Sequence, residues 1–195
     1  MPRWEAGAEA RLTRAAYELY IERGFEHVTV AEIAERAGLT KRTFFRYFDD
    51  KREVLFSGAP ALQAAVVDAV TTTPENVAPI DAVVAALASA GRGITEIGEG
   101  ARARQRLIES SSELQEREMI KMVALKDAIT AALQSRGVPG SLASLTAQAG
   151  VAVFQTAFER WVQKGGSADF PSLIYAALDD LRTAINPVGR AQSSP

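Results

Sequence analysis

The chain has 195 residues, of which 47% are hydrophobic and 24% are charged, and its formal net charge is −2. These values are ordinary for a globular protein of one or two domains, and they exclude a generally basic nucleic-acid binder. The absence of cysteine excludes disulfides, thiolate zinc sites and cysteine nucleophiles, and a single histidine, His27, cannot build a multi-histidine metal site. We therefore expect no cofactor, no metal site and no catalytic residues, so the chain is not predicted to be an enzyme.

Two sequence features bear on localisation. No apolar run approaches the 18 residues of a membrane span, and the N-terminal segment MPRWEAGAEA lacks the apolar core of a signal peptide. These features predict a cytoplasmic protein that does not interact with a membrane.

The apolar pattern is helical nearly throughout, which predicts an all-α fold of about nine helices. The first helix is expected over 6–23, because five apolar residues follow one face at helical spacing. These residues are Leu12, Ala15, Ala16, Leu19 and Tyr20. Gly24 is expected to end the helix, since glycine tolerates the left-handed backbone that often follows a helix.

Capping signals predict two short helices, over 30–36 and 41–47. Thr29 followed by Glu32 forms a capping-box pattern for the first, and Thr40 is placed to cap the second. The segment Ala37-Gly38-Leu39 between them is expected to form a tight turn. Two short helices joined by a glycine-containing turn are typical of a helix-turn-helix unit, whose second helix enters the DNA major groove.

The rest of the chain is divided by proline and glycine. A fourth helix is expected to begin near Lys51, to break at 57–60 because of Pro60, and to resume over 61–70. Later helices are expected over 80–97, 101–109, 112–136, 141–164 and 170–185. We therefore expect a DNA-binding domain over 8–68 with its recognition unit at 29–48, a ligand-binding and dimerisation domain over 69–186, and a disordered tail over 187–195.

Positive charge gathers at the second helix of the unit, where residues 40–52 hold five basic and two acidic residues. Lys41 and Arg42 lie at its N-terminal end, from which side chains reach guanine edges or phosphates. Phe45 offers an aromatic surface for a thymine methyl group or a sugar, and Lys51 is placed to meet a phosphate. The aromatic residues Phe44 and Phe48 are expected to pack inward on the first helix.

Residues 9–56 resemble the DNA-binding domain of the TetR family of repressors over about 50 contiguous residues without a gap, and residues 43–51 of this match read TFFRYFDDK. The family pattern often reads T-L-Y-x-Y-F-x-x-K, so Phe44 replaces the usual leucine and Phe45 the usual tyrosine. A phosphate contact made by that tyrosine hydroxyl is lost here. With the family positions added, the expected DNA-binding residues are Thr40, Lys41, Arg42, Thr43, Phe45, Tyr47 and Lys51.

Other arginines near the unit keep two interpretations. Arg46 points away from Lys41 and Arg42, so phosphate contact and simple solvation are equally consistent with its position. Arg3, Arg11 and Arg14 are likewise consistent with two interpretations. Either they contact DNA, at the backbone phosphates or in the minor groove, or they are simply solvated.

The last two expected helices, 141–164 and 170–185, carry enough apolar residues to serve both the core of the chain and a partner. The resemblance implies that they form a four-helix bundle in a homodimer. Twofold symmetry then requires a palindromic operator with half-sites one or more helical turns apart. The alternative is a thicker core within one chain.

A ligand pocket in the C-terminal domain is implied mainly by the resemblance. Candidate lining residues are Met119, Met122, Phe154, Phe158 and Trp161, although methionine and aromatic side chains more often fill an ordinary core. The implied ligand is a small, largely apolar molecule. An arginine group (Arg92, Arg102, Arg104 and Arg106) is placed either to meet an anionic ligand or to be solvated.

Together these features predict a ligand-responsive transcription regulator, a repressor by resemblance, that releases palindromic operator DNA on binding a small molecule. In this hypothesis Pro60 gives the fourth helix a hinge between ligand and DNA. The alternatives are an all-α protein-interaction module and an enzyme, neither of which would bind DNA.

Overall fold

The computed structural model describes residues 7–93, 99–166 and 168–186 of the chain. In these ranges it contains α-helices and short 3-10 segments and no strand, which confirms the all-α prediction. The elements are α1 (Ala8–Arg23), η1 (Phe25–His27), α2 (Val30–Arg36), α3 (Lys41–Tyr47), η2 (Glu53–Phe56), α4 (Ala59–Thr72), α5 (Pro79–Ala90), α7 (Glu99–Glu109), α8 (Ser112–Ser135), α9 (Gly140–Gln163) and α10 (Phe170–Ile185). The predicted tail 187–195 and the end of the helix expected over 80–97 lie outside the described residues.

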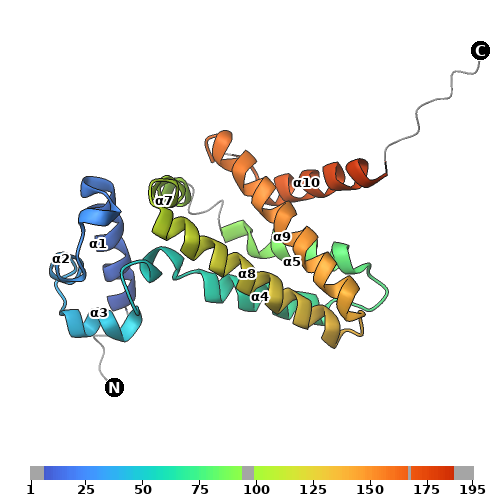
Figure 1. The fold of residues 1–195 in the computed structure, drawn as a ribbon, viewed down its shortest axis with the longest axis horizontal. Helices are drawn as coiled ribbons and strands as arrows, with labels where there is room; N and C mark the ends of the chain where they lie inside the picture. Colours follow the sequence, from blue (N-terminus) through green and yellow to red (C-terminus); the bar gives the residue numbers. More distant parts are fainter. Residues whose placement is uncertain (1–6, 94–98, 167, 187–195) are drawn as a thin grey trace, which may run out of the picture. The chain divides into compact units, whose positions relative to one another are not determined.

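The chain packs as two compact units, and their division does not follow the sequence. The first unit joins the described residues of 1–60 to those of 99–121, and the second joins those of 61–98 to those of 122–186. Figure 1 shows α7 beside α1, far from it in sequence. The expected DNA-binding domain over 8–68 therefore leaves out α7 and the first part of α8, which pack with α1.

The core of the first unit is built on the apolar stripe of α1. Leu12, Leu19 and Tyr20 are fully buried, as the helical spacing predicts. Phe44 and Phe48 are also buried and belong to the same core, which confirms that they point inward. The cluster is completed from three later elements, η2, α7 and α8, by Val54, Leu55, Phe56, Leu107, Ile108 and Leu114.

The connection from α3 to α4 differs from the expected helix beginning at Lys51. Glu53–Phe56 forms a 3-10 segment, and α4 begins only at Ala59. Pro60 stands in the first turn of α4, where a missing N–H breaks no hydrogen bond. The predicted break is therefore present, at Ser57-Gly58, and Pro60 lies at the start of the helix that follows it.

The run Glu53–Thr72, which comprises η2 and α4, is long and apolar enough by composition to cross a membrane. The expectation that no apolar run approaches this length is therefore wrong. Core helices share the same composition, and Val54, Leu55 and Phe56 are buried in the first unit.

In the second unit α5 packs against both α9 and α10, which also pack against each other (Figure 1). Val83, Val84 and Leu87 of α5 are fully buried. Gly150 of α9 lies against Val83, so close that an added Cβ would overlap the valine Cγ1. This glycine lets the two helices approach closely.

Candidate nucleic-acid interface

The turn between α2 and α3 is closed by main-chain hydrogen bonds. The N–H of Gly38 donates to the carbonyl of Glu35 over 2.8 Å, and the N–H of Leu39 donates to that of Ala34 over 2.8 Å. Gly38 has a φ of +65°, a left-handed conformation that glycine adopts without strain. The turn is therefore the tight glycine turn that the sequence predicts.

Both helices of the unit begin at the predicted threonines. The N–H of Glu32 donates to Thr29 Oγ1 over 3.3 Å, and the N–H of Thr29 donates to Glu32 Oε2 over 2.9 Å, so the capping box is complete. The N–H of Thr43 donates to Thr40 Oγ1 over 3.1 Å, which caps α3. The observed bounds of α2 and α3 are those predicted.

The outward face of α3 carries Lys41, Arg42 and Phe45, which are all exposed. The Phe45 side chain is unusual because it is large and apolar yet 55% exposed. Its ring meets the buried Phe44 ring edge to face, with centroids 5.6 Å apart, which limits its movement. This face of α3 therefore presents two cationic side chains and an aromatic ring that packs on the buried Phe44.

Tyr47 and Arg46 form a pair at the end of α3. Arg46 Nη2 donates to the Tyr47 hydroxyl oxygen over 3.2 Å, and its guanidinium carbon lies 5.0 Å from the ring centroid. A tyrosine hydroxyl that accepts one hydrogen bond still has its own proton to donate. This contact places Arg46 against the Tyr47 hydroxyl and ring and is consistent with either of the two interpretations given to Arg46.

Lys51 turns inward to main-chain carbonyls. Its Nζ lies 2.9 Å from the oxygen of Phe25, 3.1 Å from that of Val28 and 3.4 Å from that of Glu26. An ammonium has three N–H donors, and three carbonyls surround this one. The geometry does not support the predicted phosphate contact, because Lys51 joins the residues after α3 to η1.

Tyr20 of α1 also binds the main chain at Lys51. Its hydroxyl donates to the carbonyl of Lys51 over 2.6 Å, and burial raises the pKa of the phenol. The α1 helix and the segment after α3 are therefore held together by a neutral hydrogen-bond donor within the core. Nothing in the sequence pattern distinguishes this tyrosine from an ordinary core aromatic.

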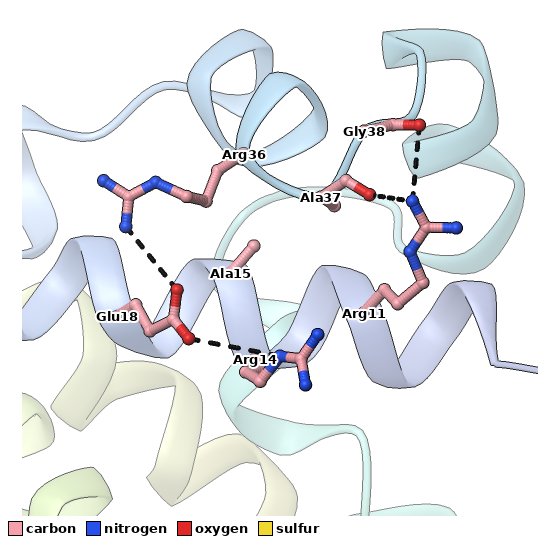
Figure 2. A pocket seen from close by; sticks show the side chains of 7 residues that line it. All are labelled: Arg11, Arg14, Ala15, Glu18, Arg36, Ala37 and Gly38. Atoms are coloured by element: carbon pink, nitrogen blue, oxygen red, sulfur yellow. Dashed lines mark hydrogen bonds and ion pairs between the residues drawn. The ribbon is translucent and has the colours of Figure 1, made fainter.

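Two of the arginines with open interpretations lie on α1 beside the turn (Figure 2). Arg11 Nη2 donates to the carbonyl of Ala37 and, over 3.5 Å, to that of Gly38. Arg14 Nε is 4.0 Å from Glu18, and its side chain is 75% exposed. A polar hollow of about 430 Å³ lies between them and Arg36. Arg3 lies outside the described residues.

Charged side chains tie η2 to α7 and α8 in the first unit. Glu53 pairs with Arg117 and, over 2.8 Å, with Lys121. Arg104 Nε donates to the carbonyl of Leu55 over 2.7 Å, and its guanidinium carbon lies 4.8 Å from the centroid of the Phe56 ring. Sequence spacing alone does not show these long-range pairs.

Of the four arginines placed from sequence either near an anionic ligand or on a solvated face, Arg102, Arg104 and Arg106 have structural partners. Arg102 and Arg106 both pair with Glu99, and Arg104 is held by Leu55 and Glu118. Arg92 is exposed. These contacts favour ordinary surface and structural roles over an anion site.

The five expected pocket residues are divided between the two units. Phe154, Phe158 and Trp161 gather around Phe170 of α10, with ring centroids 5.5, 6.0 and 6.1 Å from the Phe170 ring. Trp161 is fully buried, and its Nε1 donates to the carbonyl of Ala168 over 3.0 Å. The aromatic residues therefore fill the core. Met122 is half-buried in the second unit, whereas Met119 belongs to the first unit and is exposed.

This arrangement, a short capped helix with an exposed basic and aromatic face joined by a glycine turn to a second helix, defines a helix-turn-helix DNA-binding protein. Residues 12–57 match the family of bacterial regulatory proteins of the tetR type, and residues 77–186 match the MftR C-terminal domain. The chain therefore belongs to the tetR family of bacterial transcriptional regulators.

Transcriptional regulators of known sequence match only part of this chain. The HTH-type transcriptional regulator TcmR of Streptomyces glaucescens is 38% identical over 73 residues, which is 37% of this chain and 32% of that protein. The chain thus matches about a third of the length of this relative.

Solved structures share the whole fold at low identity. SmeT, the repressor of the Stenotrophomonas maltophilia multidrug efflux pump SmeDEF, superposes with a TM-score of 0.59 and is 18% identical, covering 96% of each chain. FadR of Thermus thermophilus, solved with lauroyl-CoA, has a TM-score of 0.52 and is 22% identical, covering 96% of this chain and 98% of its own.

Proposed function

We propose that this chain is a repressor that binds a palindromic operator as a homodimer and releases it when a small molecule binds. The observation that carries the proposal is the outward face of α3. Lys41, Arg42 and Phe45 are exposed at a capped helix, while Phe44 and Phe48 anchor the other side of the same segment in the core. A helix held in this way presents its polar face as a rigid surface for a major groove.

The residues proposed to contact DNA are divided by role. Lys41 and Arg42 reach base edges or phosphates, Phe45 contacts base or sugar, and the Tyr47 hydroxyl donates to a phosphate oxygen. Thr40 and Thr43 contribute at the N-terminus of α3, where Thr40 also caps the helix. Lys51 is left out, because its ammonium is surrounded by main-chain carbonyls.

A homodimer through α9 and α10 is supported by apolar side chains that the second unit leaves exposed. Leu145 of α9 and Ile185 of α10 are each 68% exposed, and Leu142 and Tyr175 are exposed as well. A second copy of the same surface, related by a twofold axis, would remove these side chains from water. It would also supply the second recognition helix that a palindromic operator requires.

The ligand proposal rests on relatives of the same fold. SmeT has been solved with triclosan and FadR with lauroyl-CoA, both of which have large apolar parts. We propose a small, largely apolar effector for this chain, without assigning the residues that hold it. Triclosan and lauroyl-CoA are suitable first probes in a DNA-release assay.

Selection from a random pool of DNA duplexes tests the proposed function without knowledge of the operator. The full chain should enrich a twofold-symmetric sequence, and its affinity for that duplex should fall steeply with salt. Arg42→Ala should relax specificity at one base position by about 1–3 kcal/mol, whereas Arg106→Ala on α7 removes the same charge as a control. Failure to enrich any sequence at low salt would contradict the proposal.

A further inference from the structure

Arg11 joins α1 to the turn of the helix-turn-helix unit, as Figure 2 shows. Its Nη2 donates to the carbonyls of both Ala37 and Gly38, which lie 26 and 27 residues further along the chain. The residue next to it, Leu12, is fully buried, so the backbone from which Arg11 extends is fixed in the core. The guanidinium therefore reaches the turn from a rigid base.

The two carbonyls lie at a place where a donor is needed. The last carbonyls of a helix have no partner within that helix, and its C-terminus carries partial negative charge. Ala37 and Gly38 directly follow α2, which ends at Arg36. A guanidinium at this position satisfies the carbonyls and matches their charge.

The Arg11 guanidinium also fills the space beside Gly38. A Cβ built on Gly38 would lie 2.9 Å from Arg11 Nη2, which is closer than ordinary contacts allow. The arginine is thus packed against the one residue of the turn that has a positive φ of +65°. The Arg11 guanidinium occupies its position because Gly38 has no Cβ, so the glycine turn and the position of the Arg11 side chain are linked.

Recognition-helix placement follows from this contact, because α3 begins at Lys41, three residues after Gly38. We propose that Arg11 is a positioning residue for operator recognition, which orients α3 through the turn rather than by contact with a phosphate. This inference rests on the proposed DNA-binding function.

Arg14 provides the matched comparison on the same helix. It lines the same hollow, but it has a loose 4.0 Å contact with Glu18, and its side chain is 75% exposed. Arg36 contacts the other oxygen of Glu18 over 3.5 Å. Arg14 therefore carries the same charge in nearly the same place, and its contact is with Glu18 on its own helix.

The experiment compares the affinity of full-length Arg11→Ala, Arg11→Lys and Arg14→Ala for the duplex that the wild-type protein enriches and for a scrambled duplex. Arg11→Ala should reduce the ratio of specific to non-specific affinity by about tenfold, the loss expected for a charged hydrogen bond. Its slope of log affinity against log salt should stay unchanged. Arg11→Lys should recover part of the ratio, and Arg14→Ala should leave the ratio as in the wild type.

Other results would overturn the inference. Equal loss on both duplexes, with a salt slope smaller by about 0.9, would identify Arg11 as a phosphate contact. An unchanged ratio in Arg11→Ala would exclude positioning. If Arg11→Ala does not fold, as judged by helical circular dichroism, Arg11→Met takes its place, because it keeps the length of the side chain without its donors, and an unchanged ratio in that variant overturns the inference. Absence of any enriched duplex for the wild type would contradict the DNA-binding proposal itself.

Discussion

The ammonium of Lys51 lies 4.3 Å from the centroid of the Phe25 ring and 2.9 Å from the carbonyl oxygen of the same residue. The cation therefore contacts both the aromatic face and the main chain of η1. In both interactions the positive charge of Lys51 is directed to groups of the protein itself. This relationship separates Lys51 from Lys41, whose side chain extends into solvent from the start of α3.

Replacing Lys51 by methionine should destabilise the fold and leave the electrostatics of DNA binding unchanged. Loss of the charged hydrogen bonds should lower the free energy of unfolding by about 1–3 kcal/mol in urea titration. The salt slope of operator binding should equal that of the wild type. Lys41→Met is the control, with unchanged stability and a slope smaller by about 0.9. A stable Lys51→Met protein with the smaller slope would show that Lys51 contacts phosphate after all.

Phe45 is expected to read thymine methyl groups, because an exposed ring without a hydroxyl has only apolar surface to offer. Phe45→Ala should weaken binding to the selected duplex about tenfold. Replacing the relevant thymines with deoxyuridine should weaken wild-type binding but leave Phe45→Ala binding nearly unchanged. Equal sensitivity of both proteins to deoxyuridine would place the methyl contact on another residue.

Introducing a charge into the exposed apolar face of α9 should prevent dimer formation. Leu145→Arg would place a cation within the proposed interface, where an unpaired charge is costly. Light scattering after size-exclusion chromatography should give a dimer for the wild type and a monomer for this variant. Ala131→Arg on the exposed side of α8 is the control, and it should remain dimeric. A monomeric wild type at micromolar concentration would exclude the proposed dimer.

Gly150 is expected to be essential for the packing of α5 on α9. In Gly150→Ala the added methyl group overlaps Val83, so the helices must separate or the valine must move. Overpacking of this kind costs about 1–3 kcal/mol, which thermal or urea unfolding would detect. Ala152→Ser on the exposed side of the same helix should change stability by less than about 0.5 kcal/mol. Adding Val83→Ala to Gly150→Ala should reduce the loss, since the overlap is removed.

Asp50 should contribute to the acid sensitivity of the first unit. Hydrogen bonds from the Arg52 guanidinium and from two main-chain N–H groups hold the pKa of Asp50 below its ordinary value of 3.8. Because the pKa is lower in the folded state, the stabilisation is fully present above the ordinary value and is lost as pH falls through the folded pKa. Urea unfolding between pH 7 and pH 2 should show a wild-type advantage over Asp50→Asn that disappears in acid. An advantage that stays constant with pH would refute this role, and Asp49→Asn serves as the neighbouring control.

The sequence by itself determined the helix-turn-helix and its bounds, because those depend on local interactions. Thr29, Glu32 and Thr40 hydrogen-bond within three residues of themselves, so the starts of α2 and α3 can be predicted from neighbours along the chain. Gly38 likewise marks its turn through its own backbone preference. The inward direction of Phe44 and Phe48 follows from helical spacing.

Only the tertiary structure decided which partners the long side chains choose. Lys51, Arg11 and Arg104 each bind carbonyls more than 20 residues away, and a cation on a flexible stem gives no sign in sequence of whether it meets a phosphate or the main chain. The same holds for Trp161, whose partner Phe170 lies on another helix. Long-range packing also placed α7 with α1, because burial depends on which apolar faces meet in space rather than on their order along the chain.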